Sequence, residues 1–170
     1  YGDLIAYIDG KNVIVRNYEM GEEVQTLKHD ENVNDMTWSP NGKYIASRLQ
    51  VTFKMHVWDV HEGTIVKTLE DTHVTPLYWS PDGSKVASGF NLFMDSTVRV
   101  WDVSTWNIVH NLDLYFLKPI VYTAAISALC WSPDGKYIAV GGRRHVSVFD
   151  ITGNFVHCFE GHFAREGEWV

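Results

Sequence analysis

The chain of 170 residues has 21 acidic and 14 basic side chains, which gives a net charge of −7 with histidine neutral. Its 45% apolar and 14% aromatic content is typical of a packed globular protein and excludes a disordered one. The acidic balance, with Arg143-Arg144 as the longest basic run, argues against a nucleic-acid partner. No apolar stretch approaches the ~18 residues that span a bilayer, so we expect no membrane partner.

Two short phrases recur along the chain. A Trp-Ser-Pro-Asx-Gly phrase starts at Trp38, Trp79 and Trp131, in steps of 41 and 52 residues. A strand-like phrase follows each copy: Val57-Trp58-Asp59-Val60, Val100-Trp101-Asp102-Val103 and Val148-Phe149-Asp150-Ile151. Recurrence at this period indicates an array of one supersecondary unit. We therefore expect a single domain over residues 1–170, with units at 1–28, 29–70, 71–113 and 114–162.

The first unit is expected to be incomplete. Leu4-Ile5-Ala6-Tyr7 stands where Tyr44-Ile45-Ala46-Ser47 stands in the second unit, and Val15-Arg16-Asn17 matches Val57-Trp58-Asp59. This unit therefore lacks its first strand. The missing strand is predicted at the other end of the chain, over residues 163–170, where Glu168-Trp169-Val170 resembles a first strand.

The complete units are predicted to hold four short strands each, as the third unit illustrates. Its first strand covers about residues 74–79, and Ser80-Pro81-Asp82-Gly83 then forms a type I turn, because proline fixes φ and glycine accepts a left-handed conformation. Further strands are expected at 85–89, 97–102 and 107–112, with a loop at 90–95. No segment shows helical periodicity with caps. The expected fold class is all-β, with four-stranded antiparallel sheets.

The two cysteines are expected to be free thiols. Cys130 and Cys158 fall on the first and fourth strands of the last unit, so three strand spacings of ~4.8 Å separate them. A disulfide requires Cα atoms within ~7 Å. Free thiols favour a reducing compartment, and we expect a cytoplasmic protein.

These phrases together resemble the WD40 repeats of β-propeller proteins. The Trp-Ser-Pro-Asp-Gly turns, the Val-Arg-Val-Trp-Asp strand at 98–102 and the pair Gly161-His162 carry the resemblance, which covers nearly the whole chain as four repeats. Propellers of the TolB type share the Ser-Pro-Asp-Gly turn, but Val-Trp-Asp-Val favours WD40. The resemblance implies a β-propeller with four blades per chain, each a four-stranded antiparallel sheet.

The resemblance also implies an internal hydrogen-bond network of His, Ser or Thr, Asp and Trp. In the second repeat His29, Ser47 and Trp58 fit, whereas Thr52 stands at the Asp position. The third repeat keeps Ser88, Asp95 and Trp101, with Glu70 at the His position, and the fourth keeps almost none of the set. His29 and His162 are expected to brace loops.

Four repeats are few for a WD40 ring, and three outcomes remain open. The chain could close alone as a small ring, it could be a fragment of a larger WD40 protein, or two chains could join head to tail as a homodimer with eight blades. In the last case each chain lends its final strand to the other. We favour the two-chain ring for an isolated chain, because an open half leaves a sheet edge and an apolar face exposed.

Apolar side chains in three loops are the candidate partner-binding site. In the family, the loops before the first strand and between the second and third lie on one face, which commonly binds partners. Large aromatics there indicate a patch for a protein or peptide. An alternative is that they fold inward or pack on each other. The candidate residues are Phe53, Phe90, Leu92, Phe93, Met94, Tyr115, Phe116 and Ile120, with Arg48 and Arg144 as a basic fringe.

The sequence contains no pattern that predicts catalysis, a cofactor or a metal. Neighbouring strand residues point to opposite faces, so His157 and Cys158 cannot easily share an ion. Asp59, Asp102 and Asp150 recur by repeat, which marks them as structural. We expect a non-catalytic scaffold or recognition module; the alternatives are a self-assembling half-propeller and an enzyme with a channel site near Asn34, Asp35, Thr75 and Ser127.

Overall fold

The protein is an all-β molecule, as expected from the sequence. The computed structural model describes residues 2–70, 77–92, 95–114, 126–142 and 145–160, and these residues contain strands and turns but no helix. The strands are β1 (Leu4–Asp9), β2 (Asn12–Asn17), β3 (Glu23–Lys28), β4 (Val33–Trp38), β5 (Tyr44–Leu49), β6 (Met55–Asp59), β7 (Thr64–Leu69), β8 (Tyr78–Trp79), β9 (Lys85–Leu92), β10 (Asp95–Asp102), β11 (Ile108–Asp113), β12 (Ala128–Trp131), β13 (Tyr137–Gly141), β14 (His145–Asp150) and β15 (Phe155–Glu160).

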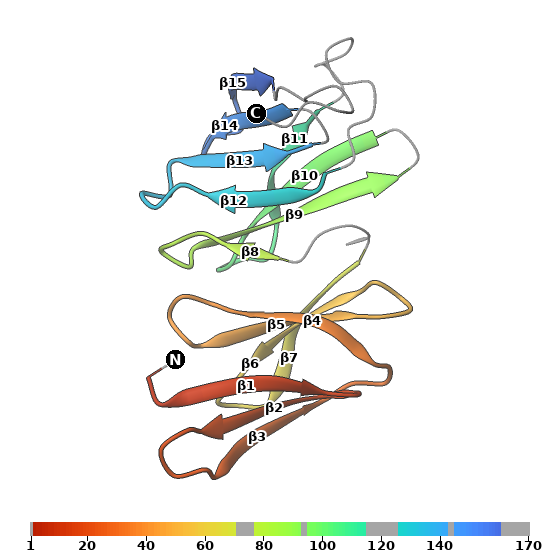
Figure 1. The fold of residues 1–170 in the computed structure, drawn as a ribbon, viewed down its shortest axis with the longest axis vertical. Coiled ribbons are helices and arrows are strands. Elements are labelled where there is room, and N and C mark those ends of the chain that lie inside the picture. The colour runs from red at the N-terminus through yellow and green to blue at the C-terminus, as the bar shows by residue number, and fades with distance from the viewer. Residues whose placement is uncertain (1, 71–76, 93–94, 115–125, 143–144, 161–170) are drawn as a thin grey trace, which may run out of the picture.

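The strands form four antiparallel sheets, each an uninterrupted meander. The first sheet holds β1–β3, and the second, third and fourth hold β4–β7, β8–β11 and β12–β15. The first sheet has three described strands and the others have four, in agreement with the expectation that the first unit begins at its second strand. Figure 1 shows the sheets following one another in chain order along the longest axis of the molecule.

The first and fourth sheets lie at opposite ends of the molecule (Figure 1). The described residues therefore form an open arc, and closure of the chain alone as a small ring, one of the three outcomes left open, is not seen in this part of the molecule. The strand predicted over 163–170, which was expected to close the first sheet, lies outside the described residues.

One predicted loop belongs to the third sheet. Residues 90–95 were expected to be irregular, but β9 runs to Leu92 and β10 starts at Asp95, with Phe90 opposite Thr97 in the ladder. Phenylalanine and threonine favour extended backbone, and the register between β9 and β10 allows pairing to continue past the expected end. Phe90 and Leu92 are therefore strand residues, and only their backbones are described by the structure.

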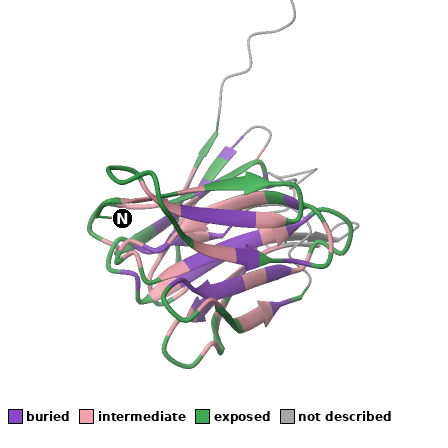
Figure 2. Ribbon diagram, turned by 90° about the horizontal axis from the view of Figure 1, so that it is seen from below, coloured by how far each residue is buried: buried purple, intermediate pink, exposed green. Residues whose placement is uncertain are grey.

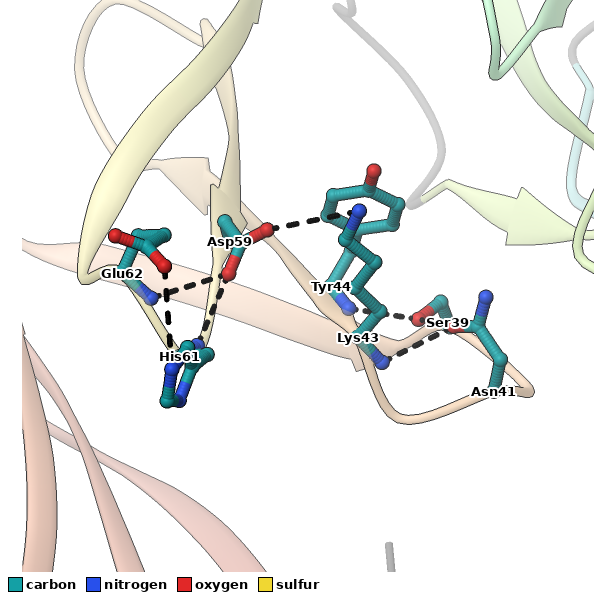
Figure 3. Close-up of polar contacts among 7 residues, drawn as sticks. All are labelled: Ser39, Asn41, Lys43, Tyr44, Asp59, His61 and Glu62. Carbon is teal, nitrogen blue, oxygen red and sulfur yellow. Dashed lines mark hydrogen bonds and ion pairs between the residues drawn. The ribbon is translucent and has the colours of Figure 1, made fainter.

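Each Trp-Ser-Pro-Asx-Gly phrase makes the same turn. In the second sheet the Gly42 amide donates to the Ser39 carbonyl at 2.9 Å, and Gly42 has a φ of 68°. The Ser39 hydroxyl donates to Asn41 Oδ1 at 2.7 Å and accepts the Tyr44 amide at 2.8 Å (Figure 3). Ser80 and Ser132 make the same bonds in the third and fourth sheets. The turn is thus fixed by local side-chain chemistry.

Three apolar clusters hold neighbouring sheets together. One joins the first and second sheets around Val15, Leu27 and Trp58, another joins the second and third, and the last joins the third and fourth around Val100 and Phe149. Figure 2 shows buried residues in the central strands and exposed residues at the turns. The core is therefore a series of sheet-to-sheet interfaces and not a single interior.

The cysteines occupy the expected strands. Cys130 lies on β12 and Cys158 on β15, the two edge strands of the fourth sheet, and both are free thiols. Among the described residues no helix is long and apolar enough to cross a bilayer.

Candidate binding face at the β5–β6 loop

The structure describes only part of the predicted partner-binding patch. Phe53 lies in the loop between β5 and β6, and Arg48 lies near the end of β5. The backbones of Phe90 and Leu92 belong to β9. The remaining candidates lie outside the described residues, so the continuous patch stays a prediction: Phe93, Met94, Tyr115, Phe116, Ile120 and Arg144.

The β5–β6 loop presents two apolar side chains to solvent. Val51 is 72% exposed and Phe53 is 38% exposed. The Leu49 amide donates to the Lys54 carbonyl at 2.8 Å, and Phe53 has a φ of 55°. A left-handed conformation is unusual for a bulky residue and is strained unless neighbouring contacts hold it. The loop is therefore closed tightly on itself with its apolar tip directed outward.

Glu31 fixes this loop from the segment that precedes β4. Its carboxylate accepts the Val51 amide at 2.7 Å and the Thr52 amide at 3.2 Å, and it also accepts the Thr52 hydroxyl. The Gln50 amide donates to the Asn32 carbonyl at 2.9 Å. The Thr52 hydroxyl bond, with the two backbone amides, lowers the pKa of Glu31. Two loops of the same face are thus tied together by one charged acceptor.

Sequence reasoning missed Glu31. The signal that could have found it is Thr52, which stands where the family network places an aspartate. Because Thr52 carries a hydroxyl in place of that carboxylate, it can donate a hydrogen bond to an acidic side chain of a neighbouring segment. Glu31 and Thr52 are 21 residues apart, so no local pattern links them.

Two cations lie beside the β5–β6 loop, Lys54 and the predicted fringe residue Arg48, and the first of them is paired. Lys54 Nζ lies 2.8 Å from Glu70 Oε1, and this contact raises the pKa of Lys54 and lowers the pKa of Glu70. Arg48 is half-buried, and its Nε is buried without a hydrogen-bond partner. The loop is therefore flanked by an ion pair on one side and a cation on the other.

A buried polar network lies in the second sheet, next to the segment that carries Glu31. His29 Nε2 lies 2.7 Å from Ser47 Oγ, and Trp58 Nε1 donates to His29 Nε2 at 3.0 Å. His29 Nδ1 lies 3.1 Å from the Lys11 carbonyl, so the tautomer with a proton on Nδ1 satisfies both contacts. Burial lowers the pKa of His29, which keeps its ring neutral. The structure thus brings these three predicted residues together.

The other predicted network residues lie in the third sheet or outside the described residues. Ser88 and Trp101 are both buried in the third sheet. Asp95 lies at the start of β10, and its side chain is outside the description, as is His162. In the same sheet the Nε1 atom of Trp79 is buried without a partner. The second sheet is therefore the one in which three predicted network residues contact one another through described hydrogen bonds.

The recurring aspartates have structural contacts. Asp59 accepts the amides of His61 and Glu62 at 3.0 and 3.1 Å, and Lys43 Nζ lies 3.9 Å away (Figure 3). Asp102 and Asp150 accept backbone amides in the turns after β10 and β14. These bonds hold the pKa of Asp150 at about 2, with the Thr152 hydroxyl as the largest cause. Within the described ranges no three acidic, histidine or cysteine side chains gather as metal ligands.

Known proteins with the same repeats identify the family. Residues 8–117 match the sequence profile described as "Eukaryotic translation initiation factor eIF2A", and residues 118–150 match that of "WD domain, G-beta repeat". The fold is also similar to that of a chain in the crystal structure of the mitotic checkpoint complex, with a TM-score of 0.72 at 21% identity. The superposition covers 95% of this chain and 48% of that one. The chain belongs to the eIF2A and WD40 families of β-propeller proteins.

The curated relatives of this WD40 protein are much longer than the chain. Protein HIRA of Caenorhabditis elegans is 32% identical over 124 residues, which cover 72% of this chain and 13% of the relative. Periodic tryptophan protein 2 homolog of Schizosaccharomyces pombe is 28% identical over 103 residues, which cover 59% of this chain and 11% of the relative. The predicted WD40 resemblance is confirmed, and WD40 propellers are generally protein-interaction scaffolds.

Proposed function

We propose that this WD40 protein is a non-catalytic scaffold that binds a protein or peptide through its β5–β6 loop. The observation that carries the proposal is the exposure of Val51 and Phe53 on a loop whose amides Glu31 holds. Exposed aromatic side chains on a preorganised loop bind partners at a low entropic cost, because the loop does not need to be ordered on binding.

The partner is expected to contribute an apolar side chain. Phe53 and Val51 supply apolar area, whereas Lys54 is already paired with Glu70 and adds little net charge to the loop. Interface centres are enriched in aromatic side chains and surrounded by polar groups, which matches a Phe53 tip with an ion pair beside it. The other predicted patch residues would extend this surface.

A peptide library displayed on phage tests the proposal. The immobilised chain should enrich peptides that carry aromatic or large aliphatic residues, and Phe53→Asn should reduce their binding at least tenfold. Asparagine tolerates the left-handed conformation of residue 53, so this variant removes the side chain without straining the loop. Val24→Asn is the matched control, because Val24 is 53% exposed on β3, away from the loop. Equal binding by both variants would refute the site.

The second candidate function is self-assembly of the half-propeller. One observation favours it: the fourth sheet has exposed valine and phenylalanine side chains on the face that lies away from the third sheet. The two functions involve different surfaces and do not exclude each other. The relatives are several times longer than the chain, so the activity of any longer protein is also a proposal.

We also propose a cytoplasmic location, because an exposed free thiol such as Cys130 persists in a reducing compartment. Fractionation of cells that express a tagged chain tests this, and recovery with the secreted or membrane fraction would refute it.

A further inference from the structure

The same four positions recur on one face of every sheet. The three strands of the first sheet are counted here as the second to fourth strands of a unit. In each sheet an alanine on the second strand pairs with a valine on the third, and a valine or methionine two residues away on the third strand pairs with a leucine or phenylalanine on the fourth. We call each set a quartet. The quartets are Ala6, Val15, Val13 and Leu27; Ala46, Val57, Met55 and Leu69; Ala87, Val100, Val98 and Leu112; and Ala139, Val148, Val146 and Phe159.

The first three quartets are interfaces between sheets. Their third- and fourth-strand residues are at most 3% exposed, and each quartet lies in the cluster that joins its sheet to the next one. The opposing sheet contributes an aliphatic residue paired with an aromatic one: Ile45 with Trp58, Val86 with Trp101 and Ile138 with Phe149. One packing arrangement is thus used three times.

The fourth quartet has the same register, but no described residue covers it. Val146 is 40% exposed and Phe159 is 57% exposed, while Val148 and Ala139 are half-buried. Tyr137, which is 42% exposed, and the exposed Cys130 lie on the same face. Large contiguous apolar faces are rare on monomeric proteins and mark interaction sites. We propose that this face binds the first sheet of a second copy of the chain.

The first sheet offers the complementary face. Ile5 pairs with Arg16 in the position where Ile45 pairs with Trp58, and Ile5 and Tyr7 are 48% and 41% exposed. In addition, β1 is an edge strand of its sheet among the described residues. The two faces lie at opposite ends of one molecule, so they meet only between copies (Figure 1). Two such arcs joined head to tail give eight sheets, and one arc already covers 48% of a known propeller chain.

Arg16 makes this interface weaker than the internal ones. It replaces the aromatic residue of the other sheets, and its guanidinium lies 3.8 Å from Glu23. The aliphatic part of an arginine can pack on apolar surface while its charged end remains paired in solvent. The interface between copies is therefore reversible, whereas the three internal interfaces are part of the fold. This assembly rests on the proposed self-assembly of the half-propeller and not on the partner of the β5–β6 loop.

Sedimentation equilibrium of the full chain tests the proposal. The wild-type chain should reach twice its mass of 19.4 kDa at micromolar concentrations. Val146→Lys and Ile5→Lys should each give monomers, with the dissociation constant raised at least a hundredfold. Val66→Lys is the matched control and should remain dimeric, because Val66 is also 40% exposed but lies on β7. Circular dichroism checks that each variant keeps its strand content.

Mixing the two monomeric variants decides which faces meet. Each variant retains one intact face, so a mixture of Val146→Lys and Ile5→Lys should form a dimer through one restored interface. A wild-type chain that stays at 19.4 kDa up to 100 µM overturns the proposal. So does an Ile5→Lys variant that dimerises as well as the wild type, because the fourth sheet would then bind its own copy. A mixture that stays monomeric also overturns it.

Discussion

The second and fourth sheets have the same strand order and the same turns, yet they differ in two respects. The second has a satisfied network of His29, Ser47 and Trp58, and both of its faces are covered. In the fourth sheet Phe149 replaces the tryptophan, and His145 Nε2 is buried without a partner. One of its faces is exposed. Sheet packing is therefore maintained by the apolar quartets, and the polar network is an addition to them.

The difference in polar networks also explains why the ordered β5–β6 loop lies on the second sheet. His29, which lies in the segment before β4, bonds to Ser47 of β5 and Trp58 of β6, and Glu31 follows two residues later. The network therefore positions the segment from which Glu31 reaches Val51 and Thr52. The fourth sheet has no such set of bonds among its described residues. We infer that the polar residues position the β5–β6 loop in addition to stabilising the second sheet.

The largest expected effect comes from placing a charge in equivalent quartet positions. Val98→Lys should prevent folding, because Val98 is 0% exposed between two sheets and a lone buried ammonium costs several kcal/mol, on the order of the stability of a small domain. Val146→Lys should change the unfolding free energy of the monomer by less than ~0.5 kcal/mol. Urea denaturation followed by tryptophan fluorescence measures both. A folded Val98→Lys variant would contradict the equivalence of buried quartets.

Removal of one serine hydroxyl in each of these two sheets separates the stability contributed by the polar network from that contributed by apolar packing. Ser47→Ala should destabilise the protein by about 1–3 kcal/mol, because Trp58 and His29 lose a buried hydrogen-bond partner. Ser147→Ala should have almost no effect, because its hydroxyl only approaches the Cys158 sulfur at 3.8 Å. Both serines are 0% exposed, so burial does not distinguish them. Equal losses of stability would show that the network adds nothing specific.

The sequence was sufficient to predict the parts of the fold that are encoded locally. The Ser-Pro-Asx-Gly turns and the alternation at Val98 and Val100 depend on a few adjacent residues, and the family resemblance then placed His29, Ser47 and Trp58. The extended β9–β10 hairpin and the Glu31 contact depend on partners that lie far along the chain or on ladder register. The sequence indicated that an open half exposes an apolar face, but it did not identify the residues of that face, because Val146 has the same pattern as the buried Val98.

Acid should destabilise the second sheet before the carboxylates titrate. Burial lowers the pKa of His29 and of His56 below 6.5, so the folded state favours their neutral forms. The unfolded chain binds more protons as the pH falls through 6.5, and the unfolding free energy decreases there by at most ~1.4 kcal/mol per pH unit for each group. Urea midpoints between pH 7.5 and 5 measure this slope.

Histidine variants assign the slope to the two sheets. His56→Gln should remove the contribution of one second-sheet histidine to the pH dependence of the unfolding free energy. His145→Gln should remove the contribution of a fourth-sheet histidine, because burial also lowers the pKa of His145. The control is His61→Gln, since the His61 side chain is 93% exposed. Asp150, with a pKa of about 2, loses its contribution only at far lower pH. A slope that His61→Gln alone removes would refute the assignment.

The smallest expected effect concerns the Glu31 contact, which belongs to the loop and not to the sheets. Glu31→Gln should leave the urea midpoint unchanged, because the side chain lies at the surface and the quartets are untouched. It should increase amide hydrogen exchange at Val51 and Thr52, because a neutral acceptor binds these amides less strongly than a carboxylate. Thr52→Val removes only the hydroxyl and should have a smaller effect on exchange. If exchange stays unchanged in Glu31→Gln, the loop is ordered by its own backbone turn, and Phe53 is presented without help from the network.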